Sequence, residues 1–470
     1  MAYSSITKPT DYFNTITYTG DGTTPKSITG VGFQPDWVWI KKRDGTTPHV
    51  VYDIVRGAGK QIMPDATSAE DTNNQYGYVS DFETDGYEVT QGSTNITRVN
   101  ASSATFVAWN WLAAGTAPSK TYTVKVVSDS GNKYRFDDFG TSAVTLEISE
   151  GGTYTFDQSD SSNSGHPLRF STTSDGTHGG GSEYTTGVTT TGTPGSSGAK
   201  TVITVAASAP TLYYYCSSHS GMGGQANTPT TNSFSDFSGS IQSNVSPNTT
   251  AGFSIVSFTG TGAAATVGHG LGSTPGMIIF KNRNDAVAWA VYNKTIGSSK
   301  WLQLQSNAAQ SANSAVMFNN TDPTSSVFTV NTYGGTNGSS DDMMAYCFTS
   351  IKGYSKIGSY TGNGNANGAF VYTGFKPGWV IIKRTNSTGN WTLWDTARQD
   401  NEINKPLWAD LTSAEAAQTT VKLDLLSNGF KIRGTGSNVG TSGSTYVYMA
   451  FAEAPFVGND SGTGIPVTAR

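Results

Sequence analysis

Residues 30–57 read GVGFQPDWVWIKKRDGTTPHVVYDIVRG. A proline lies just before an apolar run, WVWIK at 37–41, and a polar turn separates this run from a second one, VVYD at 50–53. Proline is tolerated at the first residue of a strand because its missing N–H is not yet needed by the ladder. A strand that is apolar at nearly every position favours the inner layer of a β-sandwich over a half-exposed sheet. The stretch therefore predicts two buried strands joined by a turn.

The same pattern occurs twice more in the chain. Residues 269–297 read HGLGSTPGMIIFKNRNDAVAWAVYNKTIG, and residues 372–399 read YTGFKPGWVIIKRTNSTGNWTLWDTARQ. Each copy is preceded by a similar strand: FNTITYTGDG at 13–22, FSIVSFTGTG at 253–262 and YSKIGSYTGNG at 354–364. Each copy ends with a strand rich in β-branched and aromatic residues: ATFVAWNWL at 104–112, DDMMAYCFTSI at 341–351 and TYVYMAFAEAPF at 445–456. We interpret these as three related β-sandwich repeats of about 100 residues, which are separate domains because solenoid repeats are far shorter.

The composition agrees with an all-β chain. Of the 470 residues, 55 are glycine and 13% are charged, against a usual charged fraction of about 25%. Four β domains are predicted at 1–115, 120–226, 250–352 and 353–460, the second being an insert between the first two repeats. Its flanking segments, 113–121 and 225–252, are small, polar and rich in Pro, Gly and Ser, so we expect flexible or irregular linkers there.

Charge and cysteine content exclude several classes. The chain has 29 basic and 34 acidic residues, a net charge of −5 and no long run of one sign, so a nucleic-acid partner is not expected. The first 20 residues lack the basic start and apolar core of a signal peptide, and no stretch approaches the ~18 apolar residues of a membrane helix, so membrane insertion is not expected. Two cysteines, Cys216 and Cys347, exclude a disulfide framework but leave one bridge open.

Residue types that often mark sites have simpler interpretations in the repeats. Core packing is expected, with sugar-stacking platforms as the alternative, for Trp37, Trp39, Trp379, Trp391 and Trp394. Loop positions are expected for His49, His178 and His269, and a packed core thiol for Cys347. Asp53 and Asp395 occupy similar places in two repeats, but the other repeat has Asn293, so no catalytic acid pair is assigned.

The insert holds a set of soft metal ligands. Residues 209–224 read APTLYYYCSSHSGMGG, in which Cys216, His219 and Met222 follow a Tyr-rich strand, and residues 145–171 present His166 in a loop. Two imidazoles and a thiolate with an axial thioether are the ligands that redox-active copper prefers. Zinc is an alternative, although Met is a poor zinc ligand. A metal-free domain that acts only as a spacer is a second alternative.

Residues 122–226 resemble the cupredoxins, the small blue-copper sandwiches such as plastocyanin and amicyanin. The resemblance rests on LEISEGGTYTF at 146–156, GHPLRF at 165–170 and YYYCSSHSGM at 213–222, in the family's order. It implies a Greek-key sandwich with a type-1-like copper site formed by His166, Cys216, His219 and Met222. The chain departs from the family in having Ser218 where a proline is usual, and in a long Gly/Ser/Thr insertion at 171–200.

The repeats, with PDWVWIKKRDG at 35–45 and YVYMAFAEAPF at 446–456, resemble a module of virion proteins of marine tailed phages, especially cyanophages and pelagiphages. This resemblance implies a non-enzymatic virion structural protein that is assembled in the host cytoplasm and exposed on the particle surface or tail. A tail fibre or host-adhesion component is expected, which binds other virion proteins and a polysaccharide or protein receptor on the host surface. Because such fibres are commonly trimeric, the resemblance also implies a homo-oligomer, as a homotrimer. Alternatives are a capsid decoration or head fibre protein, a polysaccharide-degrading tailspike, and an electron carrier.

Overall fold

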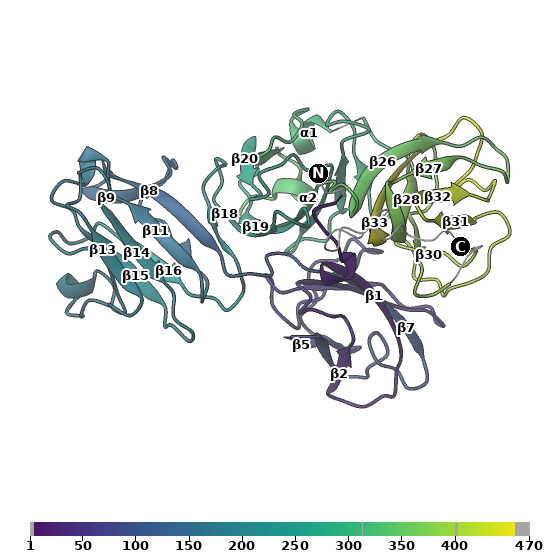
Figure 1. Cartoon of the computed structure of the whole chain (residues 1–470), viewed down its shortest axis with the longest axis horizontal. Coiled ribbons are helices and arrows are strands. Elements are labelled where there is room, and N and C mark those ends of the chain that lie inside the picture. Colours follow the sequence, from purple (N-terminus) through teal and green to yellow (C-terminus); the bar gives the residue numbers. More distant parts are fainter. Residues whose placement is uncertain (1–3, 313, 400–402, 456–470) are drawn as a thin grey trace.

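The computed structural model of the chain describes residues 4–312, 314–399 and 403–455. Its regular secondary structure is almost entirely β-strand, which confirms the all-β prediction (Figure 1). The helical elements are single turns: α1 (Ala315–Phe318), α2 (Gly334–Asn337), and the 3₁₀ turns η1 (Pro9–Asp11), η2 (Ser161–Asn163) and η3 (Gly176–Gly179). Within these ranges, no helix has the length and apolar character needed to cross a membrane. Residues 1–3 and 456–460 of the predicted domains lie outside the described residues.

Each repeat places a large sheet against a small one. In the first repeat the strand orders of the large and the small sheet are β1 (Phe13–Thr19), β7 (Thr105–Trp111), β3 (Trp37–Lys42), β4 (Val50–Asp53) for the large sheet, and β2 (Lys26–Thr29), β6 (Gly86–Thr90), β5 (Tyr78–Glu83) for the small one. In the second they are β17 (Phe234–Asp236), β18 (Ser243–Asn248), β19 (Phe253–Thr259), β25 (Asp342–Phe348), β21 (Met277–Asn282), β22 (Ala290–Asn293), β23 (Leu302–Gln303), and β20 (Ala265–Gly268), β24 (Val327–Val330). In the third they are β26 (Ser355–Thr361), β33 (Thr445–Pro455), β28 (Phe375–Arg384), β29 (Thr392–Asp395), β30 (Leu407–Trp408), and β27 (Phe370–Tyr372), β32 (Gly429–Ile432), β31 (Leu423–Leu426).

The apolar runs are continuous because the large sheets are covered on both faces. Along β3, Val38 and Ile40 pack into the core of the first repeat, between its two sheets. Trp37 and Trp39 point to the opposite face and join a second core. Successive side chains of a strand point to opposite faces, so a strand that is covered on both faces has almost no position that faces solvent.

This second core is shared by the three repeats. Its aromatic rings meet across every boundary between them: Trp37 lies 4.9 Å from Tyr346, Trp111 lies 5.4 Å from Trp379, and Phe348 lies 6.1 Å from Phe451, measured between ring centroids. The length of the repeats predicts separate domains, whereas the structure joins their inner faces in a ring around one apolar centre. The ring follows from sheets whose outer and inner faces are both apolar.

The predicted core tryptophans are confirmed. All of them are less than 3% exposed, four in the shared core (Trp37, Trp39, Trp379, Trp391) and one in the core of the third repeat (Trp394). Rings this deeply buried offer no surface on which a sugar could stack.

Three equivalent lysines link the repeats in a cycle. The Nζ of Lys41 in the first repeat donates to the carbonyl of Thr412 in the third at 3.0 Å. Lys281 of the second reaches Thr67 of the first at 3.0 Å, and Lys383 of the third reaches Ser306 of the second at 3.1 Å. Burial lowers the pKa of each ammonium group to about 8, which leaves it protonated and able to donate at neutral pH.

At two of the three boundaries between repeats, an aromatic side chain of one repeat also donates a hydrogen bond to a buried aspartate of the next. The hydroxyl of Tyr346 donates to Asp53 at 2.6 Å, and the indole N–H of Trp109 donates to Asp395 at 3.0 Å. At the third boundary the strand registers place Met449 and Asn293 in the equivalent positions. Methionine has no donor and asparagine has no charge, so donor and acid are lost together.

The insert is a further pair of sheets with its own core. One sheet contains β10 (Leu146–Glu147), β16 (Gly224–Asn227), β15 (Leu212–Cys216) and β12 (Leu168–Ser171). The other contains β13 (Val188–Thr191), β14 (Lys200–Thr204), β11 (Thr153–Asp157), β8 (Ser119–Ser128) and β9 (Asn132–Phe136). Figure 1 shows this pair extending to one side of the three repeats.

The linker predicted at 225–252 is wrong. The segment contains most of β16 and all of β17 and β18, and the last two extend the large sheet of the second repeat. The segment is mostly polar, but its Phe237 packs into the core of the insert and its Val245 into the core of the second repeat. Single apolar anchors at the right register are enough to order a segment whose composition is typical of a loop.

The cyclic acids predict a specific stability effect. Arg56 lies 2.5 Å from Asp53, and both side chains are fully buried, so Asp53→Asn should lower the free energy of unfolding by about 3 kcal/mol by leaving a buried guanidinium under-compensated. The double variant Asp53→Asn/Arg56→Ile copies the Asn293 and Ile296 of the second repeat and should be more stable than Asp53→Asn. All ten tryptophans lie outside residues 120–226, so denaturant unfolding followed by tryptophan fluorescence reports on the ring. A double variant less stable than the single one would contradict this explanation.

Candidate metal centre

Strand pairing brings three of the predicted ligands to one end of a sheet. Cys216 is the last residue of β15, and its cross-strand partner in β12 is Leu168. One residue, Pro167, separates His166 from β12, so His166 lies beside the end of β15. The turn after Cys216 then carries His219 back toward the same point before β16 begins.

The ligand atoms are spaced for a single metal ion. The Sγ of Cys216 lies 3.8 Å from the Nδ1 of His166 and 3.8 Å from the Nδ1 of His219. With metal–sulfur and metal–nitrogen bonds of about 2.3 and 2.0 Å, one metal ion needs a sulfur–nitrogen separation of about 3.7 Å in a trigonal plane and about 3.5 Å in a tetrahedron, so both arrangements are close to the observed distance. Among the residues that the structure describes, these three form the one group of His, Cys, Asp and Glu ligands that could hold a metal.

The site lies between the core and solvent. Cys216 and Met222 are buried in the core of the insert, His166 is half-buried and His219 is exposed. Burial, with a smaller effect of the His219 charge, lowers the pKa of His166. The ring therefore stays neutral, as a metal ligand must be, at lower pH than an ordinary histidine does.

Two side chains that the sequence analysis missed hold His166 in place. The carbonyl oxygen of His166 accepts hydrogen bonds from the hydroxyl of Tyr134 at 2.8 Å and from the Nε2 of Gln158 at 2.9 Å. Tyr134 comes from β9 in the opposite sheet, so these bonds fix the ligand loop between the two sheets. Bonds to a backbone carbonyl leave no motif in the sequence by which they could have been found.

The long insertion at 171–200 braces the ligand turn. Asp175 accepts a hydrogen bond from the backbone N–H of Gly221 at 2.8 Å, and the Nε2 of His178 lies 3.0 Å from the carbonyl oxygen of Cys216. His178 is in η3 and not in an isolated loop. The insertion therefore orders the turn that carries His219.

The remaining histidines and the second cysteine have structural roles. His49 and His269 lie in loops, as predicted, but both are fully buried. The Nδ1 of His49 accepts a hydrogen bond from the indole N–H of Trp39 at 2.8 Å. Cys347 is a free thiol packed in the core of the second repeat, and Cys216 is also free, so the bridge left open by the sequence is not formed.

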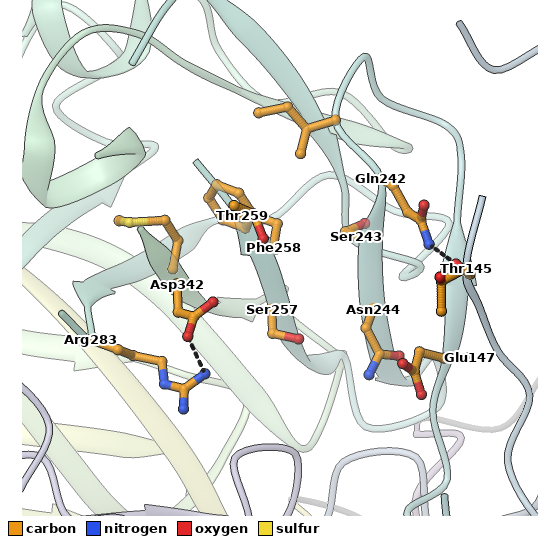
Figure 2. Close-up of a pocket in the computed structure, with 12 residues that line it drawn as sticks. Thr145, Glu147, Gln242, Ser243, Asn244, Ser257, Phe258, Thr259, Arg283 and Asp342 are labelled. Carbon is orange, nitrogen blue, oxygen red and sulfur yellow. Dashed lines mark hydrogen bonds and ion pairs between the residues drawn. The ribbon is translucent and has the colours of Figure 1, made fainter. Parts of the chain in front are cut away.

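A polar groove lies between the insert and the second repeat. It has a volume of about 450 Å³ and is lined by side chains of β10, β18, β19 and β25, including Glu147, Asn244 and Asp342. Burial raises the pKa of Glu147, whereas Asp342 forms an ion pair with Arg283 at 3.7 Å. Figure 2 shows Glu147 and Asp342 on opposite sides of the groove, with β18 and β19 between them.

A family model described as a domain of unknown function, DUF7483, matches residues 8–138 and 180–455. The matched residues include all three repeats, Cys216, His219 and Met222, and the loop of His166 lies between the two matched segments. No curated protein and no solved structure matches the chain.

The bonds to the His166 carbonyl predict a positioning effect on metal affinity. Tyr134→Phe removes one of the two donors, and we expect it to raise the dissociation constant for copper about tenfold, because the freed loop no longer holds the imidazole in place. Competition with a chelator measures this constant. Tyr122→Phe is the matched control, since it removes a bond from a buried tyrosine of the insert to the carbonyl of Ser235 and leaves His166 untouched. Equal losses in the two variants would contradict a specific role of Tyr134.

Proposed function

The chain belongs to the DUF7483 family, and from the resemblance of its repeats to phage virion modules we propose that it is a structural protein of a tailed-phage virion that adheres to the host surface and holds copper in its insert. The closed ring of three sandwiches supports a mechanical and binding role, because its shared core fixes the repeats in one rigid arrangement. On this proposal the protein is exposed on the tail or particle surface and contacts other virion proteins. We also propose a homotrimer, because the phage fibres that the repeats resemble are commonly trimeric.

The positions of the acids favour adhesion over polysaccharide cleavage. Asp53 and Asp395 are buried in ion pairs with Arg56 and Arg398, at 2.5 and 2.6 Å, where no substrate could reach them. In the polar groove, Asp342 of β25 is in an ion pair with Arg283, and Glu147 lies on the far side of β19 and β18, so these two carboxylates do not form the facing pair that a glycosidase needs.

The adhesion proposal predicts binding without degradation. Purified full-length protein should bind host cells and compete with adsorption of the phage, because its rigid modules act together. It should release no oligosaccharide from the envelope polysaccharide, and antibodies should label the tail of the particle. Steady release of oligosaccharide would favour the tailspike instead, and labelling spread over the head would favour a decoration protein.

The copper proposal rests on one observation, the two equal sulfur–nitrogen separations of 3.8 Å. This spacing allows a single metal ion to bind the thiolate and both imidazoles. The donor set agrees, because a thiolate and two imidazoles with a weak thioether are the ligands of blue-copper centres. Met222 is the residue that would supply the thioether. Copper would provide a one-electron redox centre, and the chain would contribute a thiolate and two imidazoles that already lie close together.

Metal loading tests the copper proposal directly. Metal-free protein with one equivalent of Cu(II) should develop a strong visible absorption band from the copper–thiolate bond. Cys216→Ser should abolish the band, and Met222→Leu should keep it but shift the reduction potential, since the axial ligand is weak. Cys347→Ser is the control, because this cysteine is buried in another core. No uptake at one equivalent, or unchanged affinity in His166→Ala, would make the insert a spacer.

A further inference from the structure

The third repeat exposes two aromatic rings on one strand. Phe370 is 46% and Tyr372 is 50% exposed, and in the described part of the chain only Leu411 joins them as an exposed large hydrophobic residue. Val371 between them is buried, so both rings are on the outer face of the small sheet formed by β27, β32 and β31 (Figure 1). An ideal Cβ on Gly429 would lie 3.1 Å from the Phe370 ring, so this ring lies over the neighbouring strand.

The other two repeats show that the fold does not need these rings. In β2, Ser27 and Thr29 flank the buried Ile28, and they have the same cross-strand register as Phe370 and Tyr372. In β20, Thr266 and Gly268 flank the buried Val267 in the same way. Exposed aromatic rings add nothing to the sandwich core, so their presence in one repeat only points to a ligand.

A lysine lies next to each of the two rings. The Nζ of Lys356 lies 5.2 Å from the centre of the Tyr372 ring and donates to the Tyr372 carbonyl at 2.8 Å. Lys431 is the cross-strand partner of Phe370, at the position where the first repeat has Glu88. Asp424, across from Lys431, forms an ion pair with Arg433 at 3.2 Å.

A cavity of about 410 Å³ continues this surface between the second and third repeats. It is lined by Tyr372 and by three lysines, Lys294, Lys352 and Lys356, and none of the described residues that line it is acidic. A local excess of lysine in a chain with a net charge of −5 favours an anionic ligand at this place.

We infer that Phe370, Tyr372 and the adjoining lysines bind an acidic polysaccharide. The inference rests on the proposed adhesive function and names the chemical class of its receptor. Apolar faces of sugar rings stack on exposed aromatic side chains, while lysine ammonium groups attract the carboxylates. Single-stranded nucleic acid also stacks on aromatic rings, but it carries a charge at every nucleotide and is held in long basic grooves. Here a few lysines lie on one side of two rings, which fits a polymer with more widely spaced charges.

Binding of the full-length chain to polygalacturonate, a polymer of acidic sugars, tests the inference. Dextran serves as the neutral polymer and a poly(dT) oligonucleotide as the nucleic acid. The variant Phe370→Ser/Tyr372→Thr introduces the residue types that the first repeat has at the equivalent positions, and it should weaken binding about tenfold. Lys294→Gln/Lys356→Gln should weaken it several-fold and reduce its salt dependence. Lys200→Gln, at an exposed lysine of the insert, is the matched control and should bind like wild type.

The results of these binding experiments test the polysaccharide inference independently of the adhesion proposal. Selective binding to polygalacturonate that the aromatic variant loses supports it. No binding of wild type to polygalacturonate, equal binding to dextran, or tighter binding to poly(dT) overturns it, whether or not the protein binds host cells. If the aromatic variant binds the polymer like wild type, the site is elsewhere and the inference also fails. Absence of host-cell binding by a protein that does bind polygalacturonate would refute adhesion alone.

Discussion

The structure depends on one constraint: the large sheet of each repeat is apolar on both faces. Strands such as β3, β21 and β28 are buried at almost every position, so none of these sheets could leave its inner face in water. The small sheet of each repeat covers only one face. The inner faces therefore close on one another, and three of them in one chain form a ring with a common core. The cyclic lysines follow from this closure, since each ammonium is buried beside the carbonyl groups of the next repeat.

The insert contributes its chemistry without depending on the shared core. Its core consists of residues between 122 and 237, none of which belongs to the core of the ring. The candidate metal ligands are therefore positioned by β12, β15 and the loops bound to them, and not by the shared core. The chain is thus divided into a framework of three joined repeats and an insert that carries the candidate metal site.

The sequence predicted local structure better than long-range contacts. The period of the apolar runs identified the strands, and the Cys-x₂-His spacing identified two candidate metal ligands, because both are properties of neighbouring residues. His166 was a candidate as the histidine of an upstream loop, and the structure places its Nδ1 3.8 Å from the Sγ of Cys216. The ring could not be predicted, because partners such as Tyr346 and Asp53 are 293 residues apart. The linker prediction failed where isolated anchors such as Val245 order a polar segment.

Differences among the three copies separate structural from functional residues. Where the copies differ in the shared core, the changes compensate: Met449 and Asn293 lose donor and acid together, and Ile296 replaces the arginine that would otherwise need the acid. Where they differ at Phe370 and Tyr372, both rings stay about half exposed, and Lys431 has a charge opposite to that of Glu88 in the first repeat. A compensated difference preserves the fold, whereas exposed aromatic rings that the sandwich does not need mark a surface for a ligand. The outer face of the third repeat is on this argument the part of the ring that contacts a ligand.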